Sequence, residues 1–397
     1  MKKYNKITPE GTRDLLFEEC EARRTVEKTL ADVFSSRGFH EVVTPGLEFY
    51  DVFDPEHSGI AQEDMYKMSD QRGRLVVMRP DATMPIARLT ATRLKRQPSP
   101  VRLFYNQPVY RSNPNLMGRS DEVVQTGIEL LGASGKRADL EAIAAAVESL
   151  GRCIPDFRLE IGHAGFYRAA AAQLPVSDDV REDIRRSIES KNYPALDNIL
   201  DGLEKSPAVD VMRRLPRLFG GEEVFEEAAG LCLSGEAQEM LAYLRELYQS
   251  VKGLVPGDRV MIDLGLVQRN DYYTGVVFSG YVREYGDAVL YGGRYDNLLA
   301  FFDHPMPAIG FAVNVDAIAQ ILLEKGEVLP VRPAEVLVHA QDGFEVAALA
   351  RVSRLTSVGT RCESSVFDTE DEAIAYARSK GIPRVDLVGE AVRTVAL

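Results

Sequence analysis

Strand-like patterns stop at about Tyr167 and resume only after about Lys252, and this interruption constrains the fold more than any other feature of the sequence. Within it, amphipathic helical segments such as VREDIRRSIESKN and AQEMLAYLRELYQSVKG follow one another with short polar joints. Apolar runs typical of strands lie on both sides of the interruption. The pattern predicts a sheet assembled from two separated parts of the chain, with a helical insertion between them.

A second boundary lies toward the C-terminus. A chain of 397 residues is too long for one typical core, so two or three domains are expected. Pro330 and Pro333 mark a linker, and the sequence after them alternates strand and helix patterns, as in a small α/β module. We therefore predict a core formed by residues 1–166 and 253–328, a helical insertion at 167–252, and a small C-terminal α/β domain at 334–397.

Local patterns indicate the fold class of the core. A helix is predicted from about Glu18 to Arg37, and another from Ala138 to Leu150. The segment FHEVVTPGLEFYDVF is typical of strand with a break at Pro-Gly. The runs VRLFYNQPVYRSN and DEVVQTGIELLGA, joined by a polar loop, favour an antiparallel hairpin. The predicted class is α+β, with a mainly antiparallel sheet and flanking helices.

Composition and charge argue against several functions. Hydrophobic residues make up 45% of the chain and charged residues 27%, an ordinary balance for a soluble protein. No apolar run approaches the ~20 residues of a membrane span, and the N-terminal segment lacks the apolar core of a signal peptide, so we expect a cytoplasmic protein. The net charge of −13 repels polyanions, and the basic stretch RLTATRLKRQ is interpreted as a solvated helix face.

The cysteines and histidines do not form a metal-binding pattern. Cys20, Cys153, Cys232 and Cys362 are far apart, and no CxxC pair occurs. The histidines are equally scattered, without an HxxxH pair, so we predict neither a metal site nor a cofactor. They are His40, His57, His163, His304 and His339.

Polar side chains recur at the ends of apolar strands, and two of them are predicted to share a sheet face. Gln125 and Glu129 are four residues apart in a strand, so they point to the same side. Their apolar neighbours indicate that this face is mostly buried, and a buried carboxylate needs a partner. One interpretation is a structural pair of Glu129 with Arg111. The other, which we favour, is a ligand pocket.

Such a pocket suits a small zwitterion. Asp81 can accept a hydrogen bond from an ammonium group, Glu129 can accept from a ring N–H, and Arg111 can hold a carboxylate in a bidentate fork. Tyrosines add flat apolar walls with a polar tip. Tyr291, Arg294, Tyr295 and Asp296 follow in YGGRYD, where pocket and structural roles both remain open. The predicted pocket residues are Asp81, Thr83, Arg111, Gln125, Glu129, Tyr272, Tyr273 and Tyr291.

Several motifs resemble those of the class II histidyl-tRNA synthetase core, in the same order. They are ITPEGTRDLL, RPDATMPIARL, YRSN followed by DEVVQTGIELLG, LGLVQRNDYYTGVVF, YGGRYDNLL and PAIGFAVNVDAI. The resemblance covers about residues 5 to 325 and is specific, because several ordered motifs are involved. It implies that Glu129, Tyr272 and Tyr273 recognise an imidazole. It also implies that Asp81 (a Glu in the family), Thr83 and Gln125 hold the ammonium group, while Arg111 binds the carboxylate.

The departures from the synthetase pattern concern the arginines that hold ATP phosphates. Asp121, Gln268 and Ala317 stand at three positions where the family has arginine, and Arg269 is displaced by one residue from the second. Asn113 replaces the acidic residue of the family's RxE. Losing one preorganised donor costs about a hundredfold or more in rate. We therefore predict that amino-acid activation is lost while the histidine pocket is kept.

This combination resembles the regulatory-subunit family of ATP phosphoribosyltransferase, whose members are paralogues of histidyl-tRNA synthetase. The resemblance implies a chain without catalysis of its own that activates a short-form catalytic subunit and mediates histidine feedback in the first step of histidine biosynthesis. It implies L-histidine as ligand, a homodimer through the class II-like core, a truncated anticodon-binding-like C-terminal domain, and no tRNA or membrane partner.

Other functions stay open at this point. An active histidyl-tRNA synthetase would catalyse ATP–pyrophosphate exchange with histidine. A histidine-binding module with a different partner would co-purify with that partner, and a scaffold with an empty pocket would give no heat with histidine. The partner surface, the stoichiometry, the role of the C-terminal domain, a residual tRNA contact and the choice between this pocket and an inter-subunit site for histidine are also open.

Overall fold

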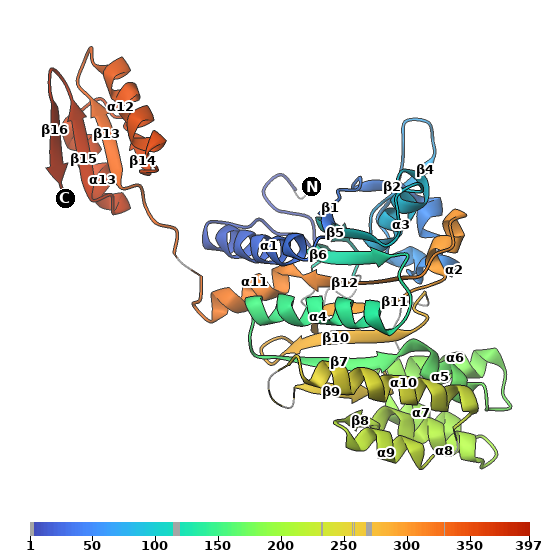
Figure 1. The fold of residues 1–397 in the computed structure, drawn as a ribbon. Helices are drawn as coiled ribbons and strands as arrows, with labels where there is room; N and C mark the ends of the chain where they lie inside the picture. The colour runs from blue at the N-terminus through green and yellow to red at the C-terminus, as the bar shows by residue number, and fades with distance from the viewer. Residues whose placement is uncertain are drawn as a thin grey trace. The chain divides into compact units, whose positions relative to one another are not determined.

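The computed structural model describes residues 4–113, 120–231, 233–255, 257, 259–266, 272–328 and 330–397. The chain divides into two compact units, Met1–Val328 and Leu329–Leu397. The first unit contains a large sheet, its flanking helices and a helical region, and the second is a small α/β unit (Figure 1).

The large sheet has nine strands in the order β1-β5-β6-β12-β11-β10-β7-β9-β8. Two of its strand pairs, β1 with β5 and β7 with β9, are parallel, and the other pairs are antiparallel. The predicted hairpin is confirmed, because β5 and β6 pair from Val101↔Leu131 to Tyr110↔Glu122. The strands are β1 (His40–Glu41), β5 (Val101–Tyr110), β6 (Glu122–Leu131), β12 (Ala308–Asn314), β11 (Ala288–Arg294), β10 (Val276–Val282), β7 (Phe157–His163), β9 (Val260–Asp263) and β8 (Phe219–Gly220).

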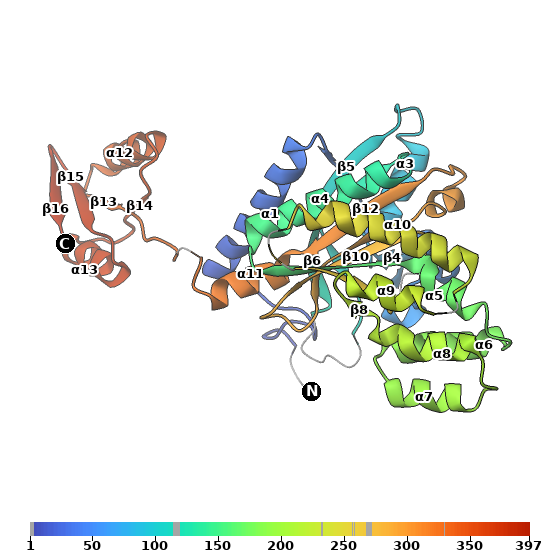
Figure 2. The same cartoon turned by 60° about the horizontal axis from the view of Figure 1, so that its bottom comes forward.

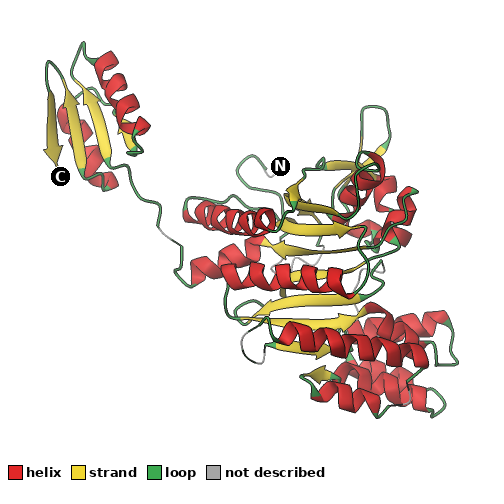
Figure 3. Cartoon of the chain, viewed as in Figure 1, coloured by secondary structure: helices red, strands yellow, loops and turns green. Residues whose placement is uncertain are grey.

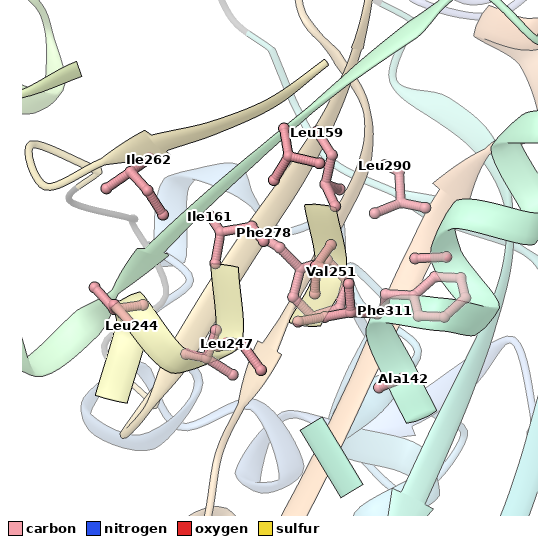
Figure 4. Close-up of a cluster of buried hydrophobic side chains, with 14 of the residues drawn as sticks. Ala142, Leu159, Ile161, Leu244, Leu247, Val251, Ile262, Phe278, Leu290 and Phe311 are labelled. Atoms are coloured by element: carbon pink, nitrogen blue, oxygen red, sulfur yellow. The ribbon is translucent and has the colours of Figure 1, made fainter. Parts of the chain in front are cut away.

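Long helices cover one face of this sheet. They are α1 (Glu18–Ser36), α4 (Lys136–Cys153), α10 (Gly235–Lys252) and α11 (Val315–Glu324). Figure 4 shows the contact between α10 and the strands: Leu244 and Leu247 lie beside Ile161 and Phe278. These side chains are less than 1% exposed, and burying a Leu or Phe side chain stabilises a fold by about 1.5–3 kcal/mol. The main core therefore lies between the sheet and these helices.

The opposite face of the sheet carries a second core. Here α3 (Thr83–Thr92) and a three-stranded sheet in the order β2-β4-β3 pack over the large sheet. Val77, Met84, Ile86, Tyr105 and Val277 are buried in this core. Its strands and short helices are β2 (Leu47–Phe49), β3 (Lys67–Ser69), β4 (Leu75–Met78), η1 (Tyr50–Phe53), α2 (Pro55–Ser58), η2 (Gln62–Asp64) and η4 (Leu298–Phe302).

Between β7 and β9 the chain is almost entirely helical, as Figures 2 and 3 show. Four of its helices begin at a Ser or Asn whose side chain accepts a backbone N–H, which is the preferred way to satisfy the first turn: Ser177, Asn192, Ser206 and Ser234. The two-residue strand β8 was not predicted; it pairs with β9 and so extends the large sheet. The elements here are α5 (Ala164–Ala171), α6 (Asp178–Glu189), α7 (Tyr193–Asp201), α8 (Pro207–Arg214), η3 (Leu215–Arg217), β8, α9 (Glu223–Ala229) and α10.

The second unit has a four-stranded sheet in the order β14-β13-β15-β16. β13 pairs in parallel with β14 and β15, whereas β16 runs antiparallel to β15. One helix covers each face. The final strand, β16, was missing from the predicted elements. The bounds are β13 (Val336–Ala340), α12 (Glu345–Ser357), β14 (Cys362–Ser364), α13 (Glu370–Lys380), β15 (Arg384–Val388) and β16 (Val392–Ala396).

One predicted strand segment and one predicted helix end earlier than expected. The strand prediction for FHEVVTPGLEFYDVF is wrong at its end, because Tyr50–Phe53 form the 3-10 helix η1. The helix predicted from Glu18 is confirmed and ends one residue early, at Ser36. Within the described residues, no helix is long and apolar enough to span a bilayer, and no cluster of three or more potential metal ligands is found.

Candidate functional site

Glu129 is the centre of a buried polar cluster on the face that carries the second core. It lies on β6, between Leu103 of β5 and Gly310 of β12, and is 2% exposed. Thr83 Oγ1 donates a 2.7 Å hydrogen bond to Glu129 Oε1, and the Tyr295 hydroxyl donates to Oε2. Burial raises the pKa of Glu129 to about 8. The pairing of Glu129 with Arg111 that we considered is therefore replaced by two hydroxyl donors.

Arg111 lies beside Asp81 instead. Its Nη2 is 3.9 Å from Asp81 Oδ2, and its Nε donates to the carbonyl of Pro80 at 2.8 Å. Asp81 Oδ1 accepts the backbone N–H of Met84 at 3.0 Å, so this carboxylate also caps the first turn of α3. Burial raises the pKa of Asp81. An acidic and a basic group thus meet at the start of α3, beside the Thr83 that contacts Glu129.

Tyrosines form the apolar walls of the cluster. The ring centroids of Tyr272 and Tyr273 are 4.8 Å apart, and Tyr272 meets Tyr295 edge-on at 5.8 Å. Burial raises the pKa of Tyr272 well above its usual value, and the charges of nearby Asp81 and Glu129 add to this effect. Tyr272 of the DYYTG segment therefore lies within electrostatic range of both carboxylates, and Tyr273 packs against it.

Glycines on two neighbouring strands make room for these side chains. Gly310 lies opposite Glu129, and a Cβ atom there would overlap Glu129 Oε2. Gly293 lies opposite Gly310, and a Cβ atom there would be 2.6 Å from Cε1 of Tyr273. Contacts under 3.0 Å are not tolerated by real Cβ atoms, so both positions require glycine. The backbone of Gly293 and Gly310, without side chains, therefore forms the floor of the site.

Two of the predicted residues lie farther along the same face. Gln125 is half-buried on β6, between Gln107 of β5 and Asn314 of β12. Tyr291 precedes Gly293 by two residues, so it shares the face of Glu129; it is 37% exposed, and its hydroxyl donates to Asp287 at 3.0 Å. The structure thus brings Asp81, Thr83, Arg111, Glu129, Tyr272 and Tyr273 together, with Gln125 and Tyr291 toward the other end of the strands.

Two of the three positions where the family has arginine, Asp121 and Ala317, are buried in the structure. Asp121 is buried, accepts the backbone N–H of Asn113 at 3.1 Å, and accepts from the Tyr66 hydroxyl. This bond to Asp121 raises the pKa of Tyr66 to about 12. Ala317 is 3% exposed in the first turn of α11. Gln268 lies outside the described residues.

Other polar residues of the motifs have structural roles. Arg294 is 6% exposed; its Nε donates to Asp139 of α4 at 2.8 Å, and its Nη1 donates to Asp296 at 2.9 Å. His163 accepts the N–H of Gly165 at 3.1 Å at the start of α5, and burial lowers its pKa to about 4. Neither side chain points to a ligand role in this structure.

Tyr295 is a residue of the site that is missing from the predicted pocket residues. It is 2% exposed and contacts Glu129 directly. The signal was present in YGGRYD, because Tyr291, Gly293 and Tyr295 alternate and therefore share one side of an extended chain. Tyr105 of β5 is also buried, and burial together with the Glu129 charge raises its pKa. It therefore belongs to the wall of the site.

Comparison with known proteins shows which family the chain belongs to. Residues 11–318 match the histidyl-tRNA synthetase family. The chain is 39% identical over 386 residues to an ATP phosphoribosyltransferase regulatory subunit of Clostridium kluyveri, covering 96% of this chain and 99% of the relative. It is 37% identical over 393 residues to the protein of that name from Bacillus mycoides, covering 97% and 92%.

Solved structures agree with these matches. The structure of an ATP phosphoribosyltransferase regulatory subunit/histidyl-tRNA synthetase from Bacillus halodurans superposes with a TM-score of 0.84 at 29% identity, over 98% of this chain and all of that one. A histidyl-tRNA synthetase from Nostoc shares the fold alone, with a TM-score of 0.76 at 20% identity, over 99% of this chain and 97% of that one.

The fold and the site define a protein of the class II histidyl-tRNA synthetase type, with a large antiparallel-rich sheet, flanking helices and a small C-terminal α/β unit. Within that class, the chain belongs to the family of ATP phosphoribosyltransferase regulatory subunits.

Proposed function

We propose that this chain binds L-histidine in the pocket around Glu129 and carries no catalysis of its own. In this proposal it activates a short-form catalytic subunit of ATP phosphoribosyltransferase in the cytoplasm and transmits feedback inhibition by histidine to it. The observation that carries the proposal is the buried Glu129 carboxyl, held by Thr83 and Tyr295 and walled by tyrosines, beside the Asp81–Arg111 pair.

The geometry supports separate roles for the pocket residues, each binding a different group of the histidine. Glu129 Oε1 and Oε2 each accept one hydroxyl, which leaves lone pairs for a ring N–H of the imidazole. The Thr83 hydroxyl donates its hydrogen to Glu129, so its oxygen can only accept a hydrogen bond from an ammonium group. The Asp81 carboxylate can accept from the same group. Arg111 uses Nε on the Pro80 carbonyl, which leaves its two terminal nitrogens for a carboxylate. Gln125 and Tyr291 are proposed to close the pocket farther along the sheet.

We propose that the chain does not adenylate histidine, and the surroundings of Asp121 support this. A carboxylate at that position repels phosphates, and here it is held by Tyr66 and Asn113 inside the protein. Ala317 offers no charge, and it is buried against the main core. Gln268, the third such position, is included in the proposal on sequence alone. We therefore propose that histidine binds here without being activated, and that no tRNA is bound.

Feedback requires that histidine bind one state of the assembly better than another. A ligand with equal affinity for both states shifts nothing, however tightly it binds. The pocket borders α3 and the β2-β4-β3 sheet on one side and the large sheet on the other, so closure around histidine links these layers. We propose that this closure is the change that the catalytic subunit senses.

A homodimer is part of the proposal, and the small sheet offers a surface for it. On its outer face Phe49 and Met68 lie on either side of Val76, and Leu47 follows along β2. Leu47, Phe49 and Met68 are 51%, 43% and 39% exposed. An apolar face of this kind suits an isologous contact with a second copy.

The deciding experiment combines the chain with a short-form catalytic subunit and measures phosphoribosyl transfer with and without histidine. We expect transfer to rise when the chain is added and to fall when histidine follows. Glu129→Gln should keep the activation and weaken the inhibition by histidine. Glu122→Gln, on the same strand, is the matched control and should keep both. Activation without any histidine effect, in a complex that contains the intact chain, contradicts the feedback role.

A further inference from the structure

A cleft adjoins the pocket on a different set of residues. It has a volume of about 390 Å³ and is lined by His57, Arg168, Tyr272, Tyr273, Thr274, Asn297 and Leu298. These come from α2, from α5, from the segment before β10 and from the start of η4. Of these lining residues, only Tyr272 and Tyr273 are also predicted pocket residues. Ligand sites for small metabolites typically have about 300–1,000 Å³, so the cleft is large enough for one.

The lining is rich in hydrogen-bond donors. Arg168 donates from Nη2 to the carbonyl of Tyr273 at 3.2 Å, which uses one of the five N–H groups of its guanidinium. The ring of His57 stacks on Phe301 with centroids 4.2 Å apart, which orients the imidazole. Asn297 adds a side-chain amide. Arg168 and Asn297 are both exposed, so their polar ends are open to a ligand.

The charge of this lining is opposite to that of the chain. The protein has 60 acidic and 47 basic residues, yet no Asp or Glu is among the described residues that line the cleft. Asp54 pairs with the His57 ring, with its Oδ1 3.8 Å from Nδ1, and it is not among the described residues that line the cleft. A donor-rich lining that has no carboxylate among its described residues favours an anion.

The cleft is also connected to the pocket through the two tyrosines that they share, Tyr272 and Tyr273. Arg168 donates to the backbone carbonyl of Tyr273, a residue that is 7% exposed and whose ring packs over Gly293. Tyr273 contacts Tyr272, and Tyr272 contacts the Tyr295 that binds Glu129. A ligand that engages Arg168 thus acts on one side of the tyrosine wall while histidine, under the proposed function, acts on the other.

We propose that this cleft binds the phosphoryl group of a small phosphorylated metabolite. The Arg168 guanidinium and the His57 and Asn297 N–H groups bind the phosphoryl oxygens, because an arginine fork matches tetrahedral oxyanions in two hydrogen bonds. Tyr272, Tyr273 and Leu298 provide the flat apolar surface for the remainder of the molecule. The site takes a ligand in addition to histidine, so it goes beyond the proposed function.

The test is calorimetric titration of the whole chain with inorganic phosphate and with ribose 5-phosphate. We expect binding of both, tighter for the sugar phosphate, and at least a tenfold loss in Arg168→Gln. Arg186→Gln, which removes an exposed arginine of α6 elsewhere in the helical region, is the matched control and should bind as the wild type does. Ring signals of His57, assigned with His57→Gln, should shift on titration and locate the ligand.

Separate outcomes distinguish this proposal from the proposed function. Histidine titration of Arg168→Gln reports on the pocket itself; retained histidine binding with lost phosphate binding supports a distinct site. Should Arg168→Gln fail to fold, His57→Gln and Arg168→Lys take its place. Acetate binding as tightly as phosphate overturns the phosphoryl assignment. No phosphate binding by the wild type, or equal binding by Arg168→Gln, overturns the site.

Discussion

The hydroxyl of Tyr295 donates a hydrogen bond to Oε2 of Glu129, across 166 residues of sequence. Glu129→Gln should weaken histidine binding by about 1–3 kcal/mol, the scale for leaving a buried polar group poorly paired. Tyr295→Phe should weaken it by a similar amount, and the double variant should lose less than the sum, because the two groups act through one bond. Calorimetric titration of the three variants measures this. Unchanged affinity in Glu129→Gln contradicts the assignment of Glu129 to the imidazole.

The raised pKa of Glu129 predicts a pH dependence of stability. Burial holds this pKa at about 8 in the folded chain, against 4.5 for an ordinary glutamate. Between these values the folded state binds the additional proton, so the free energy of unfolding should fall as the pH rises from about 4.5 to about 8. Urea unfolding at several pH values should show a shallower fall in Glu129→Gln than in the wild type. The difference between the two curves removes the contribution of other carboxyls, such as Asp263, whose pKa burial raises to about 6. Parallel curves contradict the assignment.

Gly310→Ala should disrupt the floor of the pocket. A Cβ atom at this position would overlap Glu129 Oε2, so Glu129 or β12 must shift. We expect a loss of about 1–3 kcal/mol in unfolding free energy, the usual cost of overpacking, together with weaker histidine binding. Gly286→Ala is the matched control, because no atom lies within 4 Å of the added Cβ there. Equal stability of the two variants would show that the close approach of Gly310 and Glu129 is not required.

Arg294→Met should destabilise the first unit. The variant leaves Asp139, which is 2% exposed, without its cation, and breaking one partner from a buried pair costs about 3–5 kcal/mol. Denaturant unfolding monitored by circular dichroism measures the loss. The exposed pair of Lys28 with Asp32 supplies the control, since Lys28→Met should change stability by less than about 1 kcal/mol.

Leu47→Glu should shift the proposed homodimer toward monomer. The side chain is 51% exposed on the outer face of the β2-β4-β3 sheet, and a charge there disfavours burial against a second copy. Sedimentation velocity measures the change. Val346→Glu, at an 80% exposed position of α12, is the control and should leave the mass unchanged. A dimer that tolerates both substitutions places the contact elsewhere.

Much of the fold followed from local pattern. The helix at Glu18 and the hairpin of β5 and β6 were predicted because apolar residues recur at helical or alternating spacing. Three strands were missed: β3, β8 and β16. β8 has two residues and pairs with β9, far from it in sequence, so no local pattern could indicate it. The segment Tyr50–Phe53 shows the same limit, since packing of Val52 and Phe53 in the second core determines its 3-10 turn.

The sequence by itself determined the order of the elements, the family and the chemical types of residue at the pocket, because periodicity and motif order are properties of neighbouring residues. Only the tertiary structure decided which groups meet. Thr83 and Tyr295, which are 46 and 166 residues from Glu129, became its partners, while Arg111 lies beside Asp81. Such contacts depend on the register of nine strands and on the space left by Gly293 and Gly310, neither of which can be read from a local stretch of chain.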